Sequence, residues 1–318
     1  MSFWTGKRVL VTGGAGFLGS HVVSALRKRD CTDVIVVRHQ EFDLTREDDV
    51  RRALTTSRPD VVFHLAGLVG GILPNKERPA EFFYTNLMAG TLMLHYSWKF
   101  GVSKFVAAGA GCGYPKDAPM PLKEESFWDG FPQQESAPYS LAKRLLHIQS
   151  VAYRQQYGFD SIVCVPGNLY GEHDNFTLLD AHCIPALVRK FVDAVECGYR
   201  TVEIWGTGVA TRDFVYAGDV AEGMVTAGET YSQSEIINLS SGVETSIRDV
   251  ADYLRAITGF DGEIVWNTSR PDGQPRRYFD ISKARRELGF EPRVDIRSGL
   301  ERTALWYRAH MNDPELRR

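Results

Sequence analysis

Val9-Leu10-Val11-Thr12-Gly13-Gly14-Ala15-Gly16-Phe17-Leu18-Gly19 carries the strongest structural signal in this chain. A short apolar run rich in β-branched residues breaks into glycines, and an alternating apolar pattern resumes between Val22 and Leu26. This order predicts a strand, a tight turn and a helix. Gly13, Gly16 and Gly19 are three residues apart, so backbone N–H groups can approach a pyrophosphate at the helix N-terminus. A plain turn would also need glycine, but the position between the first strand and the first helix favours a dinucleotide site.

The composition is that of an ordinary globular protein, with 318 residues, 43% hydrophobic and 24% charged, and a net charge of −3. This length allows one large core and a smaller attached lobe. The charge balance gives no electrostatic footprint for nucleic acid or for an anionic membrane, and no apolar run approaches transmembrane length.

The cysteines and the N-terminus indicate a cytoplasmic protein. Residues 1–8 lead directly into the first predicted strand and leave no room for a signal peptide. The five cysteines are odd in number and form no CxxC pair, which argues against a disulfide framework and a zinc site. They are Cys31, Cys112, Cys164, Cys183 and Cys197. We therefore expect a reducing cytosol and no metal.

Strands and helices alternate along the first half of the chain. After the first strand we expect further strands at 34–37, 43–44, 60–67, 104–108 and 161–166, with helices at 46–55 and 87–100 and one starting near Pro138. This order predicts an α/β fold with a doubly wound parallel Rossmann sheet, to which 235–239 could return. The predicted cofactor domain is 1–171 with a return segment at about 214–244. The predicted substrate lobe, smaller and mainly helical, is 172–213 and 245–318.

Arg38 follows the second predicted strand, where NAD-binding enzymes usually place an acidic residue. An arginine there accommodates the 2′-phosphate of NADP, so NADP(H) is favoured over NAD(H); the alternative is a solvated surface arginine. Asp43 could reach the adenine amino group, and His64 is expected to be a core residue rather than a catalyst. The predicted cofactor contacts are Gly13, Gly16, Phe17, Leu18, Arg38, Asp43, Leu44, Leu65, Ala66, Gly67, Tyr139, Lys143, Asn168 and Tyr170.

Tyr139 and Lys143 lie four residues apart and so share one face of a predicted helix. A lysine ammonium beside a phenol favours the phenolate, which predicts a lowered pKa for Tyr139. Such a pair suits proton transfer to or from a carbonyl or alcohol while hydride moves to or from a nicotinamide.

Basic and aromatic residues concentrate in the C-terminal part, for example Trp205, Arg212 and the segment 271–277. A nucleoside diphosphate needs arginine pairing for its phosphates and stacking for its base. A solvated surface is the alternative explanation for any single arginine there.

Together with Asn168-Leu169-Tyr170-Gly171, these motifs resemble an extended short-chain dehydrogenase/reductase, and most closely the GDP-L-fucose synthases. That family epimerises GDP-4-keto-6-deoxymannose at C3 and C5 and then reduces C4 with NADPH. The resemblance runs nearly end to end. Its specific pieces are Val69-Gly70-Gly71-Ile72, Cys112-Gly113-Tyr114-Pro115, His173-Asp174-Asn175-Phe176, His182-Cys183-Ile184-Pro185, and Pro271-Asp272-Gly273 with Pro275-Arg276.

The resemblance implies that Cys112 and His182 are the acid–base pair of the epimerisation. Inversion needs proton removal from one face and delivery to the other, and a thiol (pKa about 8.5) and an imidazole (about 6.5) both exchange protons near neutral pH. Without the family, Cys112 would be a small buried residue and His182 a helix cap. The implied substrate contacts are Val69, Cys112, Asn168, His182, Arg189, Trp205, Arg212 and Arg276.

One residue departs from the family pattern, which places Ser or Thr two residues before the cysteine, where this chain has Ala110. Alanine cannot hydrogen-bond the C4 oxygen, so another donor substitutes or the C4 redox step is altered. A second hypothesis is therefore a GDP-hexose or GDP-heptose epimerase with tightly bound NAD(P) and no net redox. A third is a non-catalytic NADP-binding regulator. A homodimer is expected from the superfamily, through the helix with Tyr139 and the one near Asn86.

Overall fold

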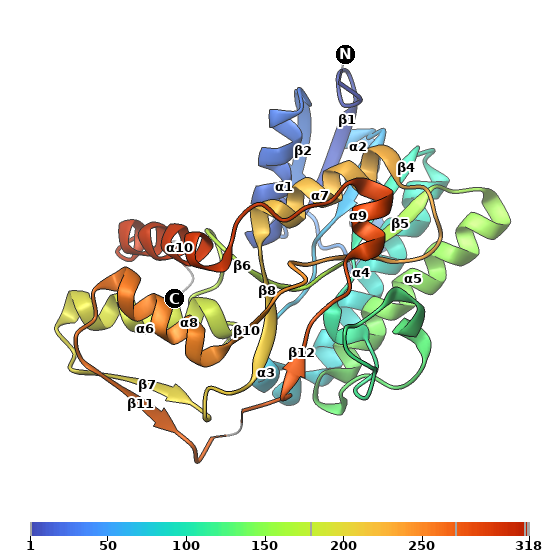
Figure 1. Cartoon of the computed structure of the whole chain (residues 1–318). Coiled ribbons are helices and arrows are strands. Elements are labelled where there is room, and N and C mark those ends of the chain that lie inside the picture. Colours follow the sequence, from blue (N-terminus) through green and yellow to red (C-terminus); the bar gives the residue numbers. More distant parts are fainter. Residues whose placement is uncertain (1, 179, 271, 315, 317–318) are drawn as a thin grey trace.

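The computed structural model describes residues 2–178, 180–270, 272–314 and 316. A six-stranded sheet lies at the centre of the larger part (Figure 1), in the order β2-β1-β3-β4-β5-β9 with every neighbouring pair parallel. This confirms the doubly wound parallel sheet and the return of the segment near Ile237. The strands are β1 (Arg8–Thr12), β2 (Asp33–Val37), β3 (Val61–His64), β4 (Lys104–Ala108), β5 (Ser161–Pro166) and β9 (Ile237–Leu239).

Helices cover both faces of this sheet, because successive side chains of each strand point to opposite sides. Val9 and Val11 pack in a core with residues of α1, α7 and α9, whereas Leu10 packs in a second core with residues of α2, α4 and α5. These helices are α1 (Phe17–Lys28), α7 (Ala217–Thr230), α9 (Ser282–Leu288), α2 (Glu47–Ser57), α4 (Pro79–Lys99) and α5 (Ala137–Tyr157). Across the described residues, every helix is too short or too polar to cross a bilayer.

Two predicted elements differ from the structure. Asp43 and Leu44 form no strand; the Asp43 carboxylate instead accepts hydrogen bonds from the backbone N–H (3.0 Å) and the hydroxyl (2.7 Å) of Thr45, which closes a turn before α2. The helix expected to begin at Asn86 begins at Pro79, a residue suited to a first helical turn. Asn86 lies inside α4, where its amide donates to the carbonyl oxygen of Phe82 (2.7 Å).

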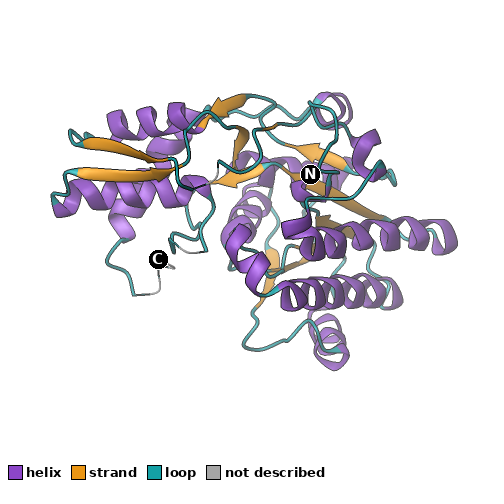
Figure 2. Ribbon diagram, turned by 90° about the horizontal axis from the view of Figure 1, so that it is seen from below, coloured by secondary structure: helices purple, strands orange, loops and turns teal. Residues whose placement is uncertain are grey.

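The smaller part of the molecule has its own core around α6, α8 and α10 (Figure 2). These helices are α6 (Cys183–Cys197), α8 (Ile247–Thr258) and α10 (Ile296–His310). A second sheet has the order β10-β8-β12, with β6 paired to β8, and a two-stranded sheet joins β7 to β11. The strands are β6 (Asn168–Tyr170), β7 (Thr201–Trp205), β8 (Thr211–Tyr216), β10 (Glu244–Ser246), β11 (Glu263–Asn267) and β12 (Arg276–Arg277).

Short elements complete the chain: α3 (Ile72–Glu77) and the 3-10 turns η1 (Gly111–Gly113), η2 (Glu124–Trp128) and η3 (Gln134–Ser136). One boundary falls differently from the predicted lobe, because α9 packs against the central sheet through the buried Ala284. Residues of the C-terminal stretch therefore contribute to both parts of the molecule.

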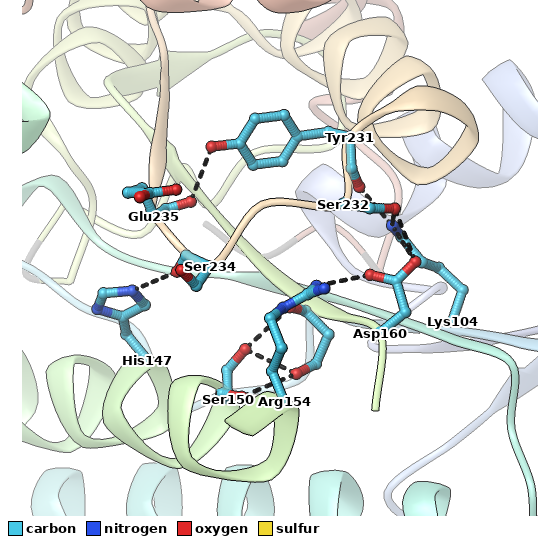
Figure 3. Close-up of polar contacts among 10 residues, drawn as sticks. Lys104, His147, Ser150, Arg154, Asp160, Tyr231, Ser232, Ser234 and Glu235 are labelled. Carbon is cyan, nitrogen blue, oxygen red and sulfur yellow. Dashed lines mark hydrogen bonds and ion pairs between the residues drawn. The ribbon is translucent and has the colours of Figure 1, made fainter. Parts of the chain in front are cut away.

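A buried ion pair fixes the amino end of β4, opposite the end at which ligands bind in such sheets (Figure 3). The Lys104 ammonium contacts the Asp160 carboxylate at 2.8 Å and donates to the carbonyl oxygen of Tyr231, and Arg154 contacts the same carboxylate at 2.6 Å. This cluster joins β4, α5 and the segment that follows α7. It is a structural anchor far from the carboxyl ends of the strands.

Candidate functional site

The glycine loop lies where the strand order reverses, at the carboxyl ends of β1 and β3. Gly13 has a φ of +70°, and a Cβ there would lie 2.8 Å from the backbone nitrogen of Ala66, so only glycine fits. The loop therefore packs directly on Leu65-Ala66-Gly67. Helix α1 begins at Phe17 with no side-chain cap and no acidic residue in its first turn. Its first backbone N–H groups, which include that of Leu18, are suited to an anion.

Arg38 follows β2 directly; its side chain is exposed and forms no ion pair with any residue that the structure describes. This position fits a 2′-phosphate contact and a solvated surface equally, so the NADP role of Arg38 stays a prediction. Leu44 is buried, and the pKa of Asp43 is lowered by its hydrogen bonds to Thr45. The Asp43 carboxylate is therefore ionised at neutral pH and held in the turn.

Lys143 is the buried cation of the site, 6% exposed. Helix α5 carries its ammonium to the carboxyl end of β4, where it donates to the carbonyl oxygen of Ala108 at 3.3 Å. A Cβ on Gly67 would lie 3.4 Å from the same nitrogen, so the loop after β3 borders it as well. Burial lowers the pKa of Lys143 to about 8. His64 is a core residue, as expected: it is 1% exposed, hydrogen-bonds Thr12 at 2.9 Å, and burial lowers its pKa to about 3.

Tyr139 differs from the prediction in its protonation. Burial raises the pKa of its phenol, and the nearby Cys112 thiol adds to this rise. The predicted lowering of this pKa by Lys143 does not appear in this structure, because burial disfavours the phenolate. The phenol keeps its proton at neutral pH, which suits it to donate that proton to a substrate oxygen.

Cys112 lies in η1, shortly after β4. It is close enough to Tyr139 and Lys143 to raise the pKa of each. The structure thus brings three of the four predicted catalytic residues together. A shallow hollow, open to solvent, adjoins the thiol. It is lined by Cys112, Tyr114, Pro115, Lys116, Met120, Leu122, Gln133, Gln274 and Arg277.

Arg277 belongs to the basic segment 271–277, but no individual role was predicted for it from the sequence. Strand β12 pairs with β8 so that Arg277 lies opposite Arg212. The charge of Arg277 acts on Arg212, and Arg212 in turn acts on the Cys183 thiol at the start of α6. This arginine pair connects the hollow beside Cys112 with the N-terminus of α6. The place of Arg277 opposite Arg212 depends on the pairing of two strands far apart in the chain, which local sequence does not reveal.

His182 is the N-terminal flanking residue of α6; it is exposed, while the surrounding protein lowers its pKa by desolvation. The imidazole is therefore neutral near pH 7 and able to accept a proton. The loop of Val69 lies close by, because the backbone nitrogen of Gly71 donates to the carbonyl oxygen of Asp180 at 3.3 Å. Val69 itself is 54% exposed.

Other predicted site residues are engaged in the protein or turned away. Tyr170 is fully buried against Gly299, so its ring is not open to a ligand, and its cofactor contact stays a prediction. Arg189 contacts Asp193 at 3.2 Å, and Arg276 forms a two-point ion pair with Glu244.

The remaining two predicted substrate residues are Asn168 and Trp205. The Asn168 amide donates to the carbonyl oxygen of Asp213 at 2.9 Å. Trp205 is 54% exposed, with the Arg270 guanidinium 5.0 Å from its ring centroid. The Lys190 ammonium lies 5.9 Å from the same centroid, so two cations border the exposed ring. Pro271 lies outside the described residues.

Comparison with known proteins places this chain among nucleotide-sugar enzymes. The NAD dependent epimerase/dehydratase family matches residues 9–240. GDP-L-fucose synthase 1 of Arabidopsis thaliana is 37% identical over 94% of this chain and 93% of its own length. A GDP-6-OMe-4-keto-L-xylo-heptose reductase from C. jejuni is 30% identical, with a TM-score of 0.90 over 98% of this chain and 100% of its own. A GDP-L-fucose synthetase from Naegleria fowleri, bound to NADP, is 25% identical, with a TM-score of 0.91 over 100% and 98%.

Proposed function

The chain belongs to the NAD dependent epimerase/dehydratase family, and we propose that it is an NADP-dependent enzyme acting on a GDP-4-keto-6-deoxyhexose. It epimerises C3 and C5 of the sugar and then reduces C4. Relatives named GDP-L-fucose synthase that align over nearly the whole chain support this proposal. The observation that carries it is the meeting of Cys112, Tyr139 and Lys143 at the carboxyl end of β4.

The residues present fit an NADP molecule. The uncapped N-terminus of α1 suits a pyrophosphate, and the exposed Arg38 suits a 2′-phosphate. Bound NADPH supplies the hydride for C4. Lys143, whose positive charge has no carboxylate partner among the described residues, would contact the bound cofactor. In this proposal 1–171 and about 214–244 bind the cofactor, while 172–213 and 245–318 bind the nucleotide sugar.

The chain's own groups account for both steps. Cys112 and His182 exchange the protons at C3 and C5, which are acidic because the electron pair of the broken C–H bond moves onto the C4 oxygen. Tyr139 then gives its proton to that oxygen as hydride reaches C4. Arg212 and the exposed Trp205 suit the diphosphate and the base of the nucleotide.

A homodimer through α5 forms part of the proposal. Leu145 and Ile148 leave 42% and 47% of their surface exposed on this helix, which an apolar partner surface would cover. Leu94 of α4, by contrast, is buried within the monomer. We place the enzyme in the cytoplasm, since that is where a reducing environment keeps Cys112 as a thiol.

The experiment is turnover of GDP-4-keto-6-deoxymannose with NADPH, followed at 340 nm and by NMR of the product. We expect NADPH oxidation and a product inverted at C3 and C5 with a hydroxyl at C4. NADPH oxidation without inversion, or no reaction, would contradict the proposal. Lys143→Met is the matched control, because it retains the fold and removes the ammonium.

A second candidate is a GDP-hexose or GDP-heptose epimerase that retains its cofactor and catalyses no net redox. Ala110 favours it, together with the likeness to a GDP-heptose reductase. Purified protein with bound NAD(H) and no need for added NADPH would support this candidate. Any turnover excludes a non-catalytic regulator.

A further inference from the structure

We propose that Arg277 is a catalytic residue that donates a hydrogen bond to the C4 oxygen of the substrate as negative charge develops on it. The inference rests on the proposed function, because it requires a 4-keto sugar beside Tyr139.

The loop between β4 and Cys112 provides no side-chain donor for that oxygen. It consists of Gly109, Ala110 and Gly111, and Ala110 is buried. Position 111 cannot carry a side chain without a shift, since a Cβ there would lie 2.7 Å from the ring of Phe279. The Tyr139 phenol therefore has no hydrogen-bonding companion from this loop. One donor to such an oxyanion contributes about 10²–10³ in rate, so its loss would be severe.

Besides Cys112, the hollow is lined by five polar side chains, and four of them are engaged or solvated. The Tyr114 hydroxyl donates to the amide oxygen of Asn238 at 2.7 Å. The Gln274 amide donates to the carbonyl oxygen of Lys116 at 3.4 Å, and Lys116 is exposed to water. Gln133 hydrogen-bonds the Glu135 carboxylate. Arg277 makes no side-chain hydrogen bond and no ion pair with any residue that the structure describes. Among the side chains that line this hollow, it is the donor that remains available.

The charged groups around Arg277 favour binding of an anion there. Its strand places it opposite Arg212, and like charges in register repel. The other groups whose charges reach it are Cys112 and Tyr114, neither of which is a carboxylate. Arg212, by contrast, has a carboxylate nearby, because the charge of Asp272 favours its protonated form. A guanidinium stays protonated in spite of the desolvation that lowers the pKa of Arg277.

Both steps can be written without a proton transfer from Arg277. When a base removes the proton beside the carbonyl, the electron pair of the C–H bond moves onto the C4 oxygen, and Arg277 donates a hydrogen bond to the enolate. In the reduction, Tyr139 gives its proton to that oxygen while hydride reaches C4. Arg277 keeps its own protons throughout. Arg212, with the neighbouring α6, is left to the diphosphate.

The test compares Arg277→Met and Arg277→Met/Ala110→Ser with the unaltered protein, using GDP-4-keto-6-deoxymannose and NADPH. We expect Arg277→Met to lower kcat, for both NADPH oxidation and deuterium incorporation, by about 10²–10³ with little change in KM. Adding Ala110→Ser restores at least about tenfold, because a serine hydroxyl replaces the lost donor. NADPH affinity, measured by fluorescence, stays unchanged and shows that the variants are folded. Arg285→Met, at an exposed arginine of α9, is the matched control.

Three results would overturn the inference. A raised KM with unchanged kcat would mean that Arg277 binds the diphosphate. A folded double variant with no recovery would remove the role at the C4 oxygen. Full activity of Arg277→Met in an active enzyme would defeat this inference alone, whereas an unaltered protein that neither reduces nor exchanges the ketosugar defeats the proposed function and this inference together.

Discussion

Lys143→Met is expected to stabilise the cofactor-free protein while abolishing its activity. Burial lowers the pKa of Lys143 from 10.5 to about 8, so the buried ammonium lowers the free energy of unfolding. At about 1.4 kcal/mol for each pH unit, that decrease is about 3 kcal/mol at pH 7. Methionine fills a similar volume without charge, and the hydrogen bond lost to the Ala108 carbonyl oxygen is worth about 1 kcal/mol. The net expectation is a gain of about 2 kcal/mol in the free energy of unfolding.

The sign of the pH dependence follows from proton binding. Between about pH 8 and 10.5 the unfolded chain still binds the lysine proton while the folded protein has released it, so the stability of the unaltered protein rises with pH. The difference in the free energy of unfolding between the variant and the unaltered protein should therefore decrease by about 2 kcal/mol from pH 7 to pH 9.5. Urea denaturation of both proteins at the two pH values measures this. The electrostatic reasoning would be refuted if this difference did not change with pH, or if the variant were less stable than the unaltered protein at pH 7.

Three further predictions concern the cofactor, the buried core and the dimer. Arg38→Ser should raise the KM for NADPH about tenfold or more and leave that for NADH unchanged, since a charge-assisted hydrogen bond is worth about 1.5–3 kcal/mol; equal effects on both cofactors would make Arg38 a surface residue. Tyr170→Phe removes a buried hydroxyl that has no hydrogen-bond partner among the described residues, so denaturation should show stability kept or raised by about 1 kcal/mol, and unchanged NADPH affinity. Weaker NADPH binding would mean that the Tyr170 hydroxyl supports the cofactor site. Ile148→Glu should convert the dimer to a monomer in sedimentation velocity; an unaltered protein that is already monomeric would contradict the interface.

The sequence predicted those parts of the fold that depend on interactions between residues close together in the chain. The run from Val9 to Gly19 predicted a strand, a turn and a helix, and the alternation of strands and helices predicted the parallel sheet. The turn at Asp43 was missed because a side-chain hydrogen bond to Thr45 competes with an extended strand. Asn86 resembled a helix start, but its amide bonds backward inside a longer helix.

The site was less predictable because its electrostatics depend on burial and on long-range pairing. The pKa of Tyr139 rises rather than falls, because burial disfavours its phenolate. Arg277 enters the site only through the pairing of β12 with β8, which no short-range pattern reveals. The proximity of Cys112 to Tyr139 and Lys143, by contrast, follows from a loop and a helix on the same edge of the sheet.

The central claim is that a thiol and an imidazole exchange protons on opposite sides of a ketosugar. The most direct measurement is NMR of GDP-4-keto-6-deoxymannose incubated in D₂O with the unaltered protein, Cys112→Ser, His182→Asn and, as a control, Cys197→Ser at an exposed cysteine. The unaltered protein and Cys197→Ser should incorporate deuterium at both C3 and C5. The Cys112 and His182 variants should each lose incorporation while NADPH still binds. Undiminished incorporation in either of those two variants would contradict the account.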